Sequence, residues 1–376
     1  MLPAYIAQFY LFCINRFMRT YLFLAILAPF FASSAPMKLK FLDEFIVPAD
    51  LRVNGDKVGG LSSIEYTGDQ YLLIVDDAKN PRYLDATINI KGKKIEHVRF
   101  DKSTALVKKG SEAGVVDPES LRIIPKSKSL VWCSEGSVRY KHAPAIFLQN
   151  EQGLASFALP KMFEIQDNSG PRHNAVFEGI TVAPSGEGVW VSMEGPLKQD
   201  GKKATVQHGS MVRISYFDFA SKQMQYQFAY YLEPLVNRAE AKPDAFRTTG
   251  LVEILQISKH QFLTMERSFT AGISDGGNSV SIYLVDMKEA TDIKNLASLH
   301  KQQFRPANKT LLLDMETIRQ QIGSKHIDNL EGITFGPMLE NGNQSLLMVS
   351  DNNFNVHGKQ LSQILLFEVI TGGKAG

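Results

Sequence analysis

Cysteine and an excess of charge of either sign are both lacking in this chain. Only Cys13 and Cys133 occur among 376 residues, and Cys13 lies in an apolar N-terminal segment. The rest of the chain therefore has no partner for an intramolecular disulfide. No histidine adjoins Cys133, so we interpret it as a small buried hydrophobic residue and not as a nucleophile. The formal net charge of +2 gives no indication of binding to nucleic acid or to an anionic membrane.

Long apolar runs are confined to the N-terminus. Residues 21–31 are apolar, with Arg16 and Arg19 before them and small residues at 32–35. This layout predicts a signal peptide over residues 1–35, with Met18 as an alternative start. A membrane anchor over residues 2–31 is the other interpretation, but the continuous run is short for a span. We expect residues 36–376 to form one exported domain, periplasmic or secreted, with no stable membrane span after cleavage.

The prominent feature of the rest of the chain is a repeat. Five times, a short apolar strand is followed 13 to 20 residues later by a second strand that ends in an acid. The copies read LSSIEY…LLIVDD, PESLRI…LVWCSE, FEGITV…VWVSME, LVEILQ…FLTMER and LEGITF…LLMVSD. In our alignment the opening positions hold Ser62, Glu119, Glu178, Glu253 and Glu331, and the closing positions hold Asp77, Glu135, Glu194, Glu266 and Asp351. Nine acids at matching places indicate a site built by repetition.

The strand count of each copy indicates the architecture. The first four copies each contain four strand-like segments, the fifth supplies three, and residues 37–48 (MKLKFLDEFIVP) offer the missing strand. Four-stranded units in series, closed by pairing the two ends, are typical of a β-propeller. We therefore predict an all-β fold, a five-bladed β-propeller of four-stranded blades closed by an N-terminal strand. Six blades are an alternative if residues 237–248 hide an irregular strand, whereas a pair of β-sandwiches explains neither the repeat nor the borrowed strand. The best helix candidate is residues 315–322.

The repeat also predicts that its acids converge. The first two strands of a blade form an antiparallel hairpin, so the start of one lies beside the end of the next. The opening and closing acids should then surround one mouth of the central channel. Like charges this close repel strongly in a partly dry channel unless a cation lies among them. The other interpretation is that each acid caps a turn or pairs with a nearby base, as Glu266 could with Arg267.

The donor types favour calcium as that cation. Only oxygen donors gather at the repeat positions, and no Cys/His cluster accompanies them, which disfavours zinc and copper. Calcium takes about six to eight oxygen ligands in irregular geometry, whereas magnesium demands a tighter octahedron. Asparagines beside Glu331 and Asp351 add neutral oxygens.

Basic residues in the loops on the same face suggest an anionic substrate. Arginine forms forked hydrogen bonds with phosphate oxygens, so bases around such a mouth are suited to bind phosphate. We favour Arg267, which adjoins a repeat acid, followed by Arg172 and Arg82. Further bases on this face are His173, Lys198, Arg247, His326 and Lys359.

Three stretches resemble one protein family. They are FEGITVAPSGEGVWVSMEGPLKQDG (177–201), FLTMERSF (262–269) followed by IYLVDM, and DNLEGITFGP…LLMVSDNNF (328–354). They are similar to the phytase-like family, described as having esterase-like activity of phytase, and the resemblance extends over about residues 39–369. It implies an exported β-propeller related to alkaline phytases, in which calcium ions hold substrate phosphates and activate a water. Carried over to this chain, the metal ligands would be Glu119, Glu135, Glu178, Glu194, Glu266, Glu331 and Asp351, with Asp77 as the closing acid of the first copy. Arg267 would contact phosphate.

Two functions are compatible with these residues. The first is a calcium-dependent phosphoesterase, in which a carboxylate accepts a proton from water, with Glu178 and Glu194 as the catalytic candidates. A glycosidase variant would use two of the same acids as acid and base. The second is a propeller that binds a partner and holds calcium only for structure, since the fold does not decide the chemistry.

Overall fold

The structure, a computed structural model, describes residues 37–107, 115–356 and 358–371. The predicted signal peptide, with Cys13 and Met18, lies outside the described residues. Among the described residues, no helix is long and apolar enough to cross a membrane.

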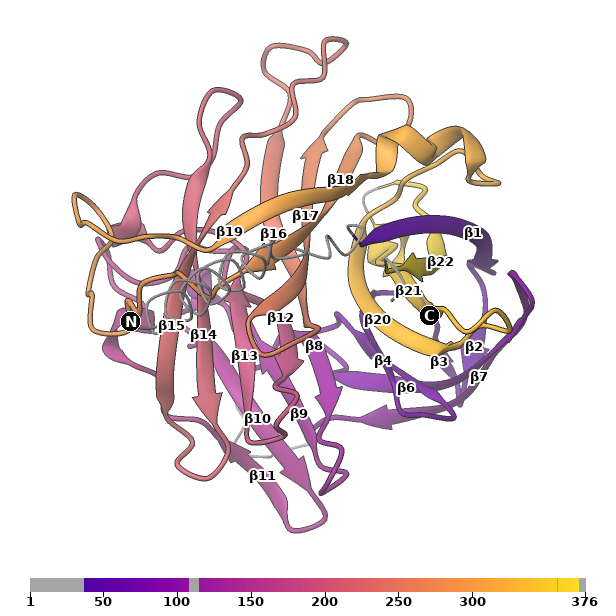
Figure 1. Ribbon diagram of the computed structural model, residues 1–376, viewed down its shortest axis with the longest axis horizontal. Coiled ribbons are helices and arrows are strands. Elements are labelled where there is room, and N and C mark those ends of the chain that lie inside the picture. Colours follow the sequence, from indigo (N-terminus) through magenta and orange to yellow (C-terminus); the bar gives the residue numbers. More distant parts are fainter. Residues whose placement is uncertain (1–36, 108–114, 357, 372–376) are drawn as a thin grey trace, which may run out of the picture. The chain divides into compact units, whose positions relative to one another are not determined.

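Five four-stranded antiparallel sheets make up the domain (Figure 1). In the first four blades the strands follow chain order from the inner strand outward. The first blade contains β4 (Leu61–Tyr66), β5 (Tyr71–Val75), β6 (Arg82–Lys91) and β7 (Lys94–Ala105), and the second contains β8 (Pro118–Ile123), β9 (Leu130–Ser134), β10 (Ala145–Asn150) and β11 (Gly153–Ser156). The third contains β12 (Phe177–Val182), β13 (Gly188–Met193), β14 (Ser210–Asp218) and β15 (Met224–Leu232), and the fourth contains β16 (Arg247–Gln256), β17 (Gln261–Thr270), β18 (Asn278–Asp286) and β19 (Asn308–Asp314). The fifth blade contains β20 (Leu330–Met338), β21 (Gln344–Ser350), β22 (Ser362–Ile370) and β1 (Lys38–Val47). A small hairpin, β2 (Arg52–Val53) and β3 (Asp56–Lys57), precedes the first blade.

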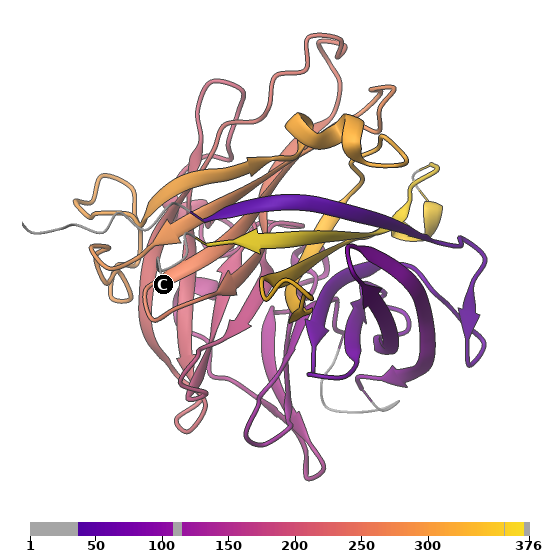
Figure 2. The ribbon, with the colours of Figure 1, turned by 45° about the vertical axis from the view of Figure 1, so that its right-hand side comes forward.

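The two ends of the described chain close the ring. β1 pairs antiparallel with β22, from Lys38 opposite Ile370 to Val47 opposite Ser362. Figures 1 and 2 show this pairing as an indigo strand alongside a yellow one. The predicted five-bladed propeller and its closure by an N-terminal strand are therefore confirmed. Residues 237–246 contain no strand, so the alternative of a sixth blade, which required an irregular strand there, is wrong.

Helical structure is limited to short 3-10 helices in the part of the chain that the structure describes. The predicted helix at 315–322 is the longest of them, η4 (Met315–Gln321), and Asp314 caps it by accepting a hydrogen bond from Glu316 N. The others are η1 (Val138–Tyr140), η2 (Lys161–Phe163), η3 (Lys198–Asp200) and η5 (Asn353–Asn355).

Apolar clusters between neighbouring blades form the core. Leu61 and Val75 of the first blade, for example, belong to the same buried cluster as Val349 and Leu366 of the fifth. The inner strands contact one another in the order β4, β8, β12, β16, β20 and back to β4. Second strands such as β5 and β13 are buried along their whole length because blades cover both of their faces. Cys133 is fully buried in one of these clusters, as its sequence context predicted.

Candidate metal and substrate site

A β-bulge interrupts the pairing of the first two strands at the same place in all five blades. The last regular pairs before the bulge are Leu61–Val75, Pro118–Ser134, Phe177–Met193, Leu251–Glu266 and Leu330–Ser350. The next residue on the inner strand is Ser62, Glu119, Glu178, Val252 or Glu331, and the next residue on the second strand is Asp76, Glu135, Glu194, Arg267 or Asp351. A bulge bends its strand and re-aims a side chain. We call these ten residues the ring positions.

This register corrects the sequence alignment in two blades. In the first blade the closing acid is Asp76 and not Asp77, which lies one residue beyond it. In the fourth blade both positions are displaced by one, so that Val252 and Arg267 stand where Glu253 and Glu266 were expected. Because neighbouring residues of a strand point to opposite faces, a shift of one residue moves a side chain out of the site. The fourth blade therefore contributes the positively charged Arg267 side chain to the ring instead of two acids.

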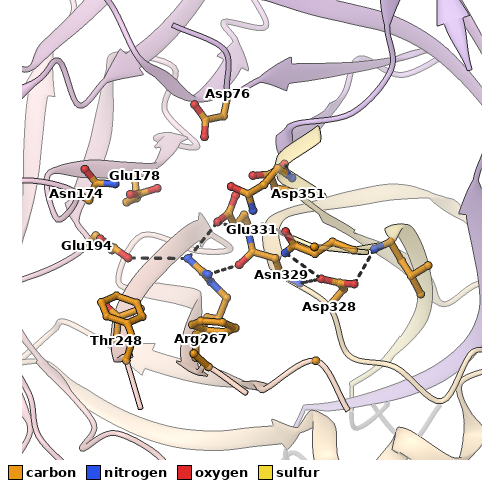
Figure 3. A pocket seen from close by; sticks show the side chains of 18 of the residues that line it. Asp76, Asn174, Glu178, Glu194, Thr248, Arg267, Asp328, Asn329, Glu331 and Asp351 are labelled. Atoms are coloured by element: carbon orange, nitrogen blue, oxygen red, sulfur yellow. Dashed lines mark hydrogen bonds and ion pairs between the residues drawn. The ribbon is translucent and has the colours of Figure 1, made fainter. Parts of the chain in front are cut away.

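Eight of the ten ring positions, all except Ser62 and Val252, line a cavity of about 1230 Å³ (Figure 3). Six of the eight predicted metal ligands line it: Glu119, Glu135, Glu178, Glu194, Glu331 and Asp351. The other two do not. Asp77 accepts a 2.8 Å hydrogen bond from Arg82, and Glu266 binds the Lys309 ammonium and the Tyr230 hydroxyl.

Two groups of carboxylates in this cavity are close enough to share a cation. Ligand oxygens of Asp76, Asp117 and Glu119 lie within 4.8 Å of one another, and so do those of Glu119, Glu135 and Glu178. Glu119 belongs to both triplets. The Oε2 atom of Glu135 is buried and has no hydrogen-bond partner among the described residues. Asp117 was missed by the sequence alignment because it precedes the repeat position and has no acidic counterpart in the other copies.

Burial and mutual repulsion disfavour the ionised forms of these acids. Burial, followed by the neighbouring carboxylates, raises the pKa of Glu119 and Glu178 well above its usual range. The same causes raise the pKa of Asp76 and Asp351 well above its usual range and bring the pKa of Glu135 to about 8. A cation among the triplets would reverse this effect by favouring the charged forms.

Arg267 lines the same cavity, beside Glu194, Asn329 and Glu331 (Figure 3). Its Nη2 atom is 3.1 Å from Glu331 Oε1 and 4.0 Å from Glu194 Oε1. Its Nη1 atom donates a hydrogen bond to Asn329, whose amide in turn donates to Glu331. Burial raises the pKa of Glu194 to about 7, although Arg267 opposes the shift. Arg267 thus partly neutralises Glu194 and Glu331 and opposes the rise in the pKa of Glu178, whereas no basic nitrogen in the described part of the chain lies within 4.0 Å of a triplet carboxylate.

Of the three predicted substrate contacts, only Arg267 lines the cavity. Arg82 is buried, pairs with Asp77 and donates to Lys57 O at 3.1 Å. Arg172 donates to the backbone carbonyls of Pro196 and Gly201. The bases that do line the cavity are His173, His326 and Lys359, which the sequence indicated, and Arg139 and Lys203, which it did not. Lys198 and Arg247 hydrogen-bond to carbonyls of nearby loops instead.

A buried ion pair connects the inner strands of several blades beyond the ring positions. Glu253 Oε2 accepts a 2.8 Å hydrogen bond from Arg122, and both side chains are almost fully buried. Arg122 also donates to Ser63 Oγ at 2.9 Å and to Ile333 O at 3.3 Å. The guanidinium therefore connects the first, second, fourth and fifth blades. Burial raises the pKa of Glu253 to about 7 despite this pairing.

A GxSxG pattern that the sequence analysis overlooked also borders the cavity. Residues 272–276 read Gly-Ile-Ser-Asp-Gly and lie in the loop between β17 and β18. In serine hydrolases this pattern forms a strained turn from a strand into a helix. Here it joins two strands, and within the described residues no hydrogen bond links the Ser274 hydroxyl to a histidine or an acid. The pattern is therefore not a nucleophile elbow.

Known proteins resemble this chain in sequence family and, more distantly, in fold. Among solved structures, the chain is similar to an endo-arabinase from Bacteroides thetaiotaomicron, with 11% identity, 85% of this chain and 96% of that chain covered, and a TM-score of 0.43. It is also similar to the catalytic domain of a GH62 alpha-L-arabinofuranosidase from Coprinopsis cinerea, with 11% identity, coverage of 88% and 97%, and a TM-score of 0.42. Both likenesses are too distant to bear on function. No curated protein matches the chain significantly.

The family comparison covers most of the domain. The family described as "Phytase-like: Esterase-like activity of phytase" matches residues 56–354, which include every ring position from Ser62 to Asp351. The match begins after β1 and the short β2 and ends before β22, so the strands of all five blades except the closing pair lie inside it. The chain belongs to the phytase-like family.

Proposed function

We propose that this protein is a calcium-dependent hydrolase that cleaves a phosphate ester in the acidic cavity. The observation that carries the proposal is the pair of carboxylate triplets that share Glu119, with Arg267 lining the same cavity. The triplets are suited to a divalent cation and Arg267 to a phosphate oxygen. Membership of the phytase-like family supports the same class of reaction.

The donor set fits a hard cation. The residues that would hold calcium are Asp76, Asp117, Glu119, Glu135 and Glu178. They offer oxygen donors only, which calcium prefers, and the unpartnered Oε2 atom of Glu135 is a buried acceptor that a cation would satisfy. Calcium bound here would neutralise phosphate charge and make a nearby water more acidic.

The remaining residues of the cavity divide the other tasks. Arg267 is held by Asn329 and Glu331 and lines the cavity, so its guanidinium is placed to donate to a phosphate oxygen. Glu178 belongs to a triplet, and we assign it to cation binding. Glu194 lies near Arg267 and outside the triplets, so we assign it to proton acceptance. Water attacks phosphorus, the bond to the leaving oxygen breaks with its electron pair, and Glu194 takes the proton that water releases.

Export is part of the same proposal. The signal-peptide pattern of residues 1–35 supports a periplasmic or secreted enzyme, where calcium concentrations suit a site of carboxylates.

Phosphate release from phytate and from 4-nitrophenyl phosphate by the full chain tests the proposal. Turnover should require calcium and stop with a chelator. We expect Glu178→Gln to lower calcium affinity at least tenfold and Glu194→Gln to lower kcat at least 100-fold with calcium affinity nearly unchanged. Ser274→Ala should leave both values unchanged, because the mechanism uses no serine nucleophile. Calcium binding without turnover on either substrate would contradict the proposal and favour a binding module with structural calcium.

A further inference from the structure

One wall of the cavity is formed by apolar side chains, which have no role in the binding of calcium or phosphate proposed above. Phe246, Phe269, Ala271 and Ile273 all line it, and all four come from the fourth blade, at the start of β16, the end of β17 and the loop that follows. We call these four residues the apolar wall. Phe246 is 65% exposed, although it is a large hydrophobic side chain. A single exposed phenylalanine needs no explanation, but one that lines a charged cavity together with three other apolar residues is arranged to meet a ligand.

Phe246 is exposed but its backbone is held in place. Its carbonyl accepts a 2.9 Å hydrogen bond from Ala271 N, which joins it to the loop after β17. The Arg247 side chain stabilises the segment that precedes Phe246 by donating a 2.9 Å hydrogen bond to Lys242 O. The loop after β17 is fixed in turn by Asp275, which accepts a 2.6 Å hydrogen bond from Arg238. The wall is thus pre-organised, which reduces the entropy that a ligand must overcome to bind it.

The geometry of β17 sets the distance from this wall to the phosphate contact. Arg267 and Phe269 are two residues apart on one strand, so their side chains project from the same face about 7 Å apart. The Phe246 ring lies beside Phe269, with centroids 6.4 Å apart and planes inclined at 51°. A phosphate at Arg267 would place the first ring of its leaving group against these two side chains.

We infer that the substrate's leaving group is a planar apolar ring, which packs against Phe246 and Phe269 while its phosphate lies between Arg267 and the carboxylate triplets. This inference rests on the proposed function and specifies its substrate class. The lining residues that the fourth blade adds around Phe246 and Phe269 are Thr248, Ala271, Gly272, Ile273, Ser274 and Gly276, none of which is charged. A substrate with phosphates on every edge, such as phytate, would place one against this wall, which is costly unless His326, whose Nδ1 atom lies 3.3 Å from Asp275 O in the loop after β17, pairs with it.

Calorimetric titration of the calcium-loaded full chain with 1-naphthylphosphonate and methylphosphonate tests the inference without requiring turnover. The naphthyl compound should bind at least tenfold more tightly. Phe246→Ala should remove most of this preference and change methylphosphonate affinity less than twofold. Phe246→Tyr should retain the preference, because it keeps the ring. Leu311→Ala is the matched control, since Leu311 is 51% exposed in the same blade, on β19, and does not line the cavity.

The outcomes separate this inference from the proposed function. Equal affinities for the two phosphonates, or a preference that survives Phe246→Ala, would overturn the ring subsite and leave the phosphate site standing. Failure of the calcium-loaded chain to bind either phosphonate would overturn both. Melting temperatures of the variants within about 1 °C of the parent would show that Phe246→Ala acts on binding and not on folding.

Discussion

Arg122 is a buried cation that is neutralised mainly by one acid. Its guanidinium is 2% exposed, and Glu253, which is fully buried, neutralises it at 2.8 Å. Glu65 is the other acid nearby, but its carboxylate is 3.7 Å away. Removing one partner of a buried ion pair leaves an uncompensated charge, which typically costs about 3–5 kcal/mol. We therefore predict that Glu253→Gln lowers the free energy of unfolding by about 3–5 kcal/mol, measured by chemical denaturation at pH 8.

Two control variants show whether a loss of stability in Glu253→Gln comes from the unpaired charge of Arg122. Glu65→Gln should cost less, because Glu65 is more exposed and more distant from Arg122. Glu240→Gln, which removes an exposed partner of Arg238, should change stability by less than about 0.5 kcal/mol. A loss for Glu253→Gln as small as that for Glu240→Gln would show that the pair adds nothing to the fold.

Among the structural elements, the bulged inner strands bring the ring positions together. Gly179 follows the ring acid Glu178 in β12, and a Cβ atom there would lie 2.6 Å from Ile254 N and 2.7 Å from the Glu253 Cα of the next blade. The glycine therefore permits the close approach of two inner strands. We predict that Gly179→Ala lowers the free energy of unfolding by about 1–3 kcal/mol and weakens calcium binding, because β12 must shift with Glu178. Thermal denaturation and calcium titration of the same variant would measure both effects.

A second glycine distinguishes crowding from the general effect of losing glycine. Gly92 lies in the turn between β6 and β7 at φ +57°, with nothing within 4 Å of the Cβ position. Gly92→Ala should introduce backbone strain of about 1 kcal/mol and leave calcium affinity unchanged. Equal effects of the two substitutions on calcium binding would contradict the role of Gly179 in positioning Glu178.

The elements also show how much could be predicted from the sequence. Period-two strands, the copy number and the unpaired N-terminal segment were sufficient for the five blades and their closure, because burial on both faces leaves a strong apolar pattern. The register of each bulge was not readable. A bulge adds one residue without changing the apolar pattern of the strand, so the sequence could not distinguish Asp76 from Asp77 as the closing residue of the first blade. For the same reason the closing position of the fourth blade was assigned to Glu266 and not to the adjacent Arg267. Arg139, Lys203 and Phe246 were missed because they lie in loops outside the repeat, where only the folded chain brings them to the cavity.

At the scale of the whole molecule, the cavity makes stability depend on pH. The pKa of Glu194 is raised to about 7 and that of Glu135 to about 8, from ordinary values near 4.5. Between about pH 4.5 and 8 the folded chain therefore binds more protons at these groups than the unfolded chain. Their contribution to stability is fully present below pH 4.5 and is lost as the pH rises through 7 to 8.

Calcium should reverse this trend, because it binds the deprotonated carboxylates that destabilise the metal-free fold. We predict that the melting temperature in chelator is several degrees lower at pH 8 than at pH 5.5. Addition of calcium should raise it more at pH 8 than at pH 5.5, and a pH-stat should record proton release on binding near pH 7. The Glu178→Gln variant provides the control, since it should keep part of the pH dependence and lose most of the calcium effect. A calcium-induced rise that is equal at both pH values, or larger at pH 5.5, would mean that calcium binds outside the buried carboxylates of the cavity, because binding elsewhere is not coupled to their loss of protons.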